Sequence, residues 1–228
     1  MDLIELKRLV AQGESQHLEF KKKANYPEKI AREIVAFANA TGGCLVLGVD
    51  DDGTVSGTRN IEGEAHVVKA AIENHIRPKL PYQLELIPIN AKKGIALFYI
   101  EEGPRKPYML NLDGEKKSYI RMKDESLQAS RELREIIRRK QRSRDIHFQY
   151  GEKEKQLMQH LEKSGEITLV EFSKLARISK YTAARTLVRL VLANVLDIVP
   201  TGTGDLYRLP TEDPSLTMPQ SNPGTRYI

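Results

Sequence analysis

The chain has 228 residues, of which 40% are hydrophobic and 29% charged, a balance typical of a folded globular protein and unlike that of a disordered chain. No apolar run approaches the roughly 20 residues that cross a bilayer, and residues 1–5 do not resemble a secretory signal, so we expect a cytoplasmic protein without a membrane partner. The only cysteine, Cys44, cannot form an internal disulfide.

The formal charge of +5 is unevenly distributed along the chain. Residues 1–130 contain 19 Lys/Arg and 19 Asp/Glu, so the remaining residues contain 17 of the 36 basic and 12 of the 31 acidic side chains. The whole surplus therefore lies in the C-terminal part, and this asymmetry favours a nucleic acid as the partner of that part.

The N-terminal part predicts alternating helices and strands. Apolar residues recur at helical spacing after Asp2, which can cap the first helix, and Gly42-Gly43 can stop the second. One expected helix begins after Asp2 and ends at Gly13, and two more span residues 27–39 and 64–76. Expected strands span residues 17–21, 44–49, 83–89, 95–100 and 117–122. Together they predict an α+β fold in which helices pack on a mixed sheet, over a domain of residues 1–128.

The C-terminal part begins with a highly charged helix at residues 130–144, interpreted as a basic connecting element within residues 129–150. A second domain at residues 151–210 is expected to contain helices at 152–163, 168–176 and 180–194, a short strand at Ile167, and a hairpin whose turn is Thr201–Gly204. Residues 211–228, with four prolines and few large apolar side chains, predict a flexible tail.

The helix at 180–194 carries the most informative pattern. One apolar stripe consists of Ala184, Leu187, Val188, Val191 and Val195. The opposite polar stripe and the N-terminal end of the helix provide the candidate DNA-binding residues, because recognition helices contact bases and phosphates there. These residues are Lys180, Tyr181, Thr182, Arg185, Thr186 and Arg189.

The order helix, helix, hairpin over about 60 residues resembles the winged helix-turn-helix of transcriptional regulators. Asn194 stands where such domains often place glycine before the wing, and asparagine tolerates a left-handed backbone. The resemblance implies a duplex DNA partner and a homodimer that meets paired half-sites, with no cofactor. Winged helices also serve as dimerisation or protein-docking modules, so a scaffold without DNA binding is an alternative.

The N-terminal domain resembles the Schlafen-type Alba-like domain (AlbA_2) over residues 10–126. The motifs that carry the resemblance are Glu14–Lys21, Ala36–Gly43 and Leu47–Asp51, followed by Pro78 and Tyr119-Ile120-Arg121. Bacterial members with a C-terminal winged helix resemble transcriptional regulators. The resemblance therefore implies a DNA-binding regulator as the first hypothesis.

A second hypothesis also comes from this resemblance. Some Schlafen proteins cleave RNA with two glutamates, an aspartate and a metal ion, and the matching positions here are Glu14, Glu19 and Asp50, with Asp51 as the competing choice. Three such carboxylates could bind Mg²⁺ or Mn²⁺ and activate water. The local alternative is that Glu14 pairs nearby, Glu19 and Lys21 form a surface ion pair, and Asp50 starts a turn.

Overall fold

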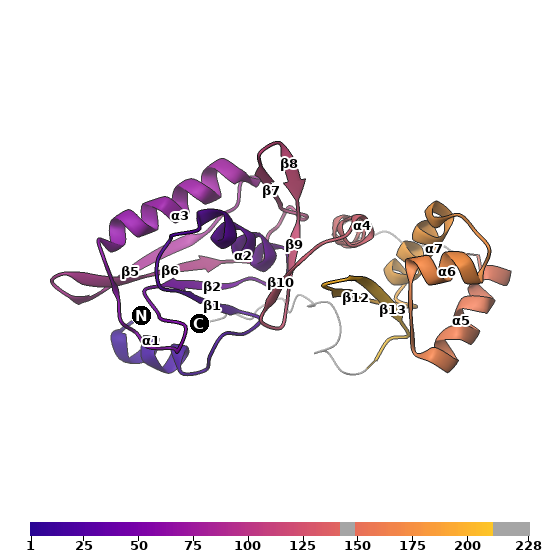
Figure 1. Ribbon diagram of the computed structural model, residues 1–228, viewed down its shortest axis with the longest axis horizontal. Helices are drawn as coiled ribbons and strands as arrows, with labels where there is room; N and C mark the ends of the chain where they lie inside the picture. The colour runs from indigo at the N-terminus through magenta and orange to yellow at the C-terminus, as the bar shows by residue number, and fades with distance from the viewer. Residues whose placement is uncertain (142–148, 212–228) are drawn as a thin grey trace. The chain divides into compact units, whose positions relative to one another are not determined.

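The computed structural model describes residues 1–141 and 149–211, and the chain divides into two compact units. Unit 1 comprises Met1–Ser126, and unit 2 begins at Leu127 (Figure 1). The predicted tail beyond residue 211 and the end of the predicted basic helix lie outside the described residues.

The main sheet of unit 1 is mixed, as the sequence predicts. Strand β2 (Gly43–Leu47) pairs in parallel with β1 (Leu18–Lys21) and antiparallel with β6 (Lys93–Ile100). Strand β6 also pairs antiparallel with β5 (Gln83–Asn90) and with the short β3 (Thr58–Arg59).

Helices cover both faces of this sheet (Figure 1). On one face, α2 (Pro27–Asn39) and α3 (Ile61–His75) pack against Leu45, Leu47 and alternate residues of β6. On the other face, α1 (Leu3–Val10) packs against Cys44, Val46 and the intervening residues of β6. Because successive residues of a strand point to opposite faces, a strand covered on both sides has the continuous apolar run that predicts β2.

The ends of the unit 1 helices follow local chemistry. The Asp2 carboxylate accepts hydrogen bonds from the amides of Ile4 and Glu5 at 2.7 and 2.8 Å, which caps α1. Gly42 has φ +87° after the end of α2, and a Cβ there would lie 2.6 Å from the carbonyl oxygen of Ile100. Glycine is therefore required by both the backbone and the neighbouring strand.

Shorter strands complete the region up to the unit boundary. Strand β7 (Met109–Leu112) pairs with β4 (Ile76–Arg77) and with β8 (Glu115–Lys117). Strand β9 (Tyr119–Met122) follows, and the chain enters unit 2 through β10 (Glu125–Gln128). Strand β9 confirms residues 119–122 of the strand predicted over 117–122, but the predicted start is wrong, since β8 ends at Lys117 and β9 begins after Ser118 in a different sheet.

Unit 2 contains α5 (Glu152–Ser164), β11 (Glu166–Thr168), α6 (Leu169–Leu175) and α7 (Lys180–Leu192), followed by the hairpin β12 (Asp197–Thr201) and β13 (Gly204–Arg208). Strand β13 pairs antiparallel with both β11 and β12. Side-chain oxygens of Thr168 and Ser179 cap α6 and α7, as their spacing predicts. Asn194 has φ +56°, the left-handed conformation expected before the hairpin.

The charged helix before α5 differs from the expected connecting element. Helix α4 (Arg131–Lys140) buries Leu133, Ile136 and Ile137 and packs against α7 within unit 2. These three residues recur at helical spacing among charged neighbours, so a narrow apolar stripe attaches the helix although most of its residues are polar. Among the helices of the described residues, none has both the length and the apolar character that a membrane crossing requires.

Candidate functional site

Helix α7 presents a polar stripe to solvent. Lys180, Tyr181, Thr182, Arg185 and Arg189 are all exposed, and Tyr181 is 64% exposed. The opposite face is buried and consists of Ala183, Leu187, Val188, Leu190 and Val191. The two faces of α7 are therefore as different in chemistry as the sequence predicts.

Two residues of α7 depart from their predicted stripes. Thr186, expected on the exposed side, is only 7% exposed, and Ala184, expected in the apolar stripe, is half-buried. The buried face is wider than a single stripe because α7 is contacted by both α4 and α6. Thr186 therefore lies beneath the exposed stripe rather than on it.

The cations of α7 are not ion-paired in the part of the chain that the structure describes. Within residues 1–141 and 149–211, neither Lys180, Arg185 nor Arg189 forms an ion pair. The guanidinium of Arg185 instead lies 5.6 Å from the ring centre of Tyr181, one turn earlier in the helix. This cation–π contact restricts Arg185 without neutralising it.

A cleft of about 550 Å³ lies beside this stripe, between α7 and the N-terminal end of α5. Its lining residues are Gln149, Lys153, Glu154, Tyr181, Thr182, Arg185, Thr186, Arg189 and Leu190. The contribution of α5 was not predicted, because the sequence does not indicate which helix end faces α7. The cleft is polar and carries more basic than acidic side chains.

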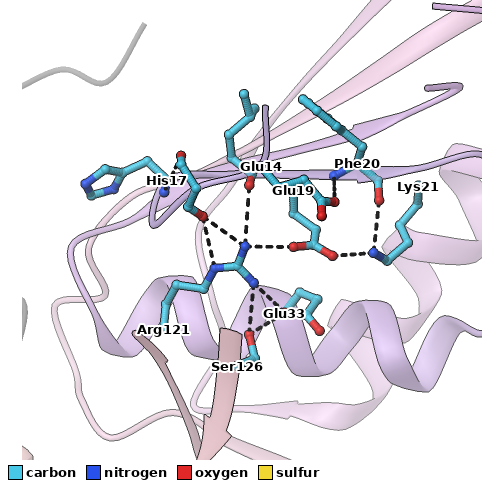
Figure 2. Close-up of polar contacts among 10 residues, drawn as sticks. Glu14, His17, Glu19, Phe20, Lys21, Glu33, Arg121 and Ser126 are labelled. Carbon is cyan, nitrogen blue, oxygen red and sulfur yellow. Dashed lines mark hydrogen bonds and ion pairs between the residues drawn. The ribbon is translucent and has the colours of Figure 1, made fainter. Parts of the chain in front are cut away.

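Two carboxylates of the nuclease hypothesis, Glu14 and Glu19, are hydrogen-bonded to other groups of unit 1 (Figure 2). Glu14 accepts a hydrogen bond from the amide of Phe20 at 2.9 Å. Glu19 is 6% exposed; one of its oxygens accepts a bond of 2.7 Å from Arg121, and the other pairs with Lys21. The expected surface pair of Glu19 and Lys21 is thus part of a buried cluster.

Arg121 lies at the centre of that cluster. The sequence predicts no role for this residue. Its guanidinium is 1% exposed and bonds Glu19, Glu33 at 3.0 Å, and the carbonyl oxygen of Ser15 at 2.9 Å (Figure 2). Burial raises the pKa of Glu33 above its ordinary value, which the hydrogen bond from Ser126 partly opposes. Arg121 lies two residues after Tyr119 in the same strand, so the two side chains point to the same face of the sheet. The strand periodicity could therefore have predicted that Arg121 is buried with Tyr119.

Asp50 belongs to a different group of contacts. It pairs with Lys22, whose hydrogen bond is the main cause of the lowered pKa of Asp50. Asp51 lies exposed in the turn that follows. Over the described residues, no group of three or more His, Cys, Asp or Glu side chains is arranged to hold a metal ion. The three carboxylates thus do not form a site that fits Mg²⁺ or Mn²⁺.

Comparison with known proteins identifies the N-terminal part. The profile of the family described as Schlafen, AlbA_2 matches residues 14–130. The N-terminal domain of a RecG-related protein from Nitrosomonas europaea is similar over 53% of this chain and 88% of its own, with 21% identity and a TM-score of 0.43. The DIP2311 protein from Corynebacterium diphtheriae is similar over 84% of this chain, and the match covers 34% of the DIP2311 chain, with 16% identity and a TM-score of 0.41. No curated protein matches.

Proposed function

Because the chain belongs to the Schlafen, AlbA_2 family and α7 exposes a basic stripe, we propose that it is a DNA-binding transcriptional regulator that binds duplex DNA through unit 2. The observation that carries the proposal is the exposure of Arg185 and Arg189 on a helix whose other face is buried. A helix of this kind can stay folded while its polar face enters the major groove, which is about 12 Å wide.

The order of elements in unit 2 supports a winged-helix interpretation. Helices α6 and α7 are joined by the short turn Ala176–Ser179, and the hairpin β12–β13 follows α7 directly. In a winged helix, α6 would be the first helix of the helix-turn-helix, α7 the recognition helix, and the β12–β13 hairpin the wing. The exposed Thr201–Gly204 turn would then lie beside α7 against the DNA backbone.

The side chains of the stripe match two kinds of contact. Arg185 and Arg189 are suited to bidentate hydrogen bonds with guanine, while Lys180 at the start of the helix is suited to a phosphate. The cation–π contact with the ring of Tyr181 restricts the Arg185 side chain before DNA binds, so the guanidinium loses less conformational entropy on binding. We also expect a homodimer, because winged-helix readers commonly bind paired half-sites.

The test is binding to duplexes selected from random fragments, measured by fluorescence anisotropy over a range of salt concentrations. Arg185→Ala with Arg189→Ala is expected to weaken binding at least ~10-fold and to flatten its salt dependence. Lys155→Ala with Lys163→Ala is the matched control, since it removes the same charge from exposed positions of α5 outside the cleft. Equal losses in both double variants, or no selected duplex, would refute the proposal.

A further inference from the structure

The cleft between α5 and α7 contains a cation that the recognition helix does not supply. Lys153 lies in the first turn of α5 and lines the same cleft as Arg185 and Arg189. Its side chain is 37% exposed, so a ligand from solvent can reach it. Any DNA bound by α7 would therefore meet a second basic element at this edge.

The acidic residue of the cleft is already engaged. Glu154 is 4% exposed; its Oε2 accepts a hydrogen bond of 3.0 Å from the amide of Gly151, and its Oε1 lies 3.0 Å from Nζ of Lys153. The remaining charged residues that line the cleft are Lys153, Arg185 and Arg189. Among the lining residues that the structure describes, one carboxylate stands against three cations, so this lining is positive, and the bond from Gly151 holds the carboxylate at the N-terminal end of α5.

We propose that this cleft is a phosphate seat, meaning a binding site for one backbone phosphate of the bound duplex: the phosphate contacts Lys153, beside the bases contacted by Arg185 and Arg189. The inference rests on the proposed function and adds to it a contact from α5. A phosphodiester fits better than an apolar or cationic ligand, because Leu190 alone among the lining residues is aliphatic and the net charge is positive.

Lys153→Ala tests the seat, with Lys155→Ala as its control. Both lysines lie on α5, but only Lys153 lines the cleft. The plot of log K against log salt concentration has a negative slope, and loss of one phosphate contact makes this slope shallower by about 0.9. We expect that change for Lys153→Ala, of similar size for cognate and unrelated duplexes, and no change for Lys155→Ala. The melting temperature of Lys155→Ala should match that of the unchanged protein, and that of Lys153→Ala, which loses the ion pair with Glu154, should lie slightly below it.

The outcomes separate this inference from the proposed function. If the unchanged protein binds no duplex, the proposed function fails and the seat fails with it. If Arg185→Ala with Arg189→Ala weakens binding but Lys153→Ala behaves like Lys155→Ala, only the seat is refuted. A final arm replaces chloride by inorganic phosphate at equal ionic strength. Greater release of the duplex in phosphate than in chloride, abolished by Lys153→Ala, supports the seat. Equal release in the two salts, or greater release that Lys153→Ala leaves unchanged, counts against it.

Discussion

Replacing Arg121 by methionine should destabilise unit 1 more than any surface change. Methionine fills much of the volume of arginine but removes the hydrogen bonds to Glu19, Glu33 and the Ser15 carbonyl, which leaves two carboxylates without their buried cation. Breaking a buried ion pair from one side costs about 3–5 kcal/mol. For a unit of the size of Met1–Ser126, that loss lowers the melting temperature by roughly 10–20 °C.

The assay must report on unit 1, because Arg121 and its bonded partners all lie in that compact unit. Amide hydrogen exchange followed by mass spectrometry of peptides from β1, α2 and β9 provides this, and urea melts by circular dichroism give the free energy of unfolding. Arg32→Met is the matched control, since Arg32 is exposed on α2 and lies 5.2 Å from the ring centre of Tyr119. It should cost less than about 1 kcal/mol. A loss for Arg121→Met no larger than this control would refute the structural role of the cluster.

Three further predictions concern buried groups of unit 1. Asn39→Ala should lower the free energy of unfolding, measured by urea melts, by about 3 kcal/mol. The side-chain amide of Asn39 donates to Ser118 and to the carbonyls of Tyr119 and Tyr108, and its oxygen accepts from the amide of Tyr108. A loss below about 1 kcal/mol would contradict this prediction. Cys44, whose pKa burial raises to about 12, should resist thiol reagents at pH 8 until urea unfolds the chain, and rapid labelling of the folded protein would be the contrary result. The raised pKa of Glu33 means that the folded state holds its proton more tightly than the unfolded chain. Its contribution to stability should therefore fall as pH rises from the ordinary value of 4.5 through the raised one, and Glu33→Gln should remove this slope in melts taken across that range.

The sequence predicts best the elements whose ends are fixed by local chemistry. Helix α2 spans the predicted residues, because Pro27 favours its first turn and Gly42 allows the chain to reverse after it. The short strands β3 and β4 were not predicted, since two residues carry no periodicity. Ser118, which separates β8 from β9, likewise does not predict that the chain passes from one sheet to another at this point.

The buried cluster around Arg121 could not be predicted because its partners are distant in the chain. Glu19 and Glu33 precede Arg121 by 102 and 88 residues, so only the folded sheet brings them together. The motif that resembles the Schlafen glutamates therefore led to Glu19 as a catalytic candidate and gave no indication of its bond to Arg121. On α7, by contrast, the exposed stripe is a local property of one helix, and five of its six candidate residues are exposed as predicted.

The charges of the two units differ in what they stabilise. In unit 1, Arg121, Lys21 and Lys22 each pair with a carboxylate, so their removal should lower stability. Helix α7 has three cations and no acidic residue, and these cations form no ion pair with any residue that the structure describes. Exposed like charges on one helix face add nothing to folding and repel one another by a few tenths of a kcal/mol. Loss of Arg185 and Arg189 should therefore not lower the melting temperature, and a repulsion that brings no benefit to the fold is the physical reason for proposing a polyanionic partner for this stripe.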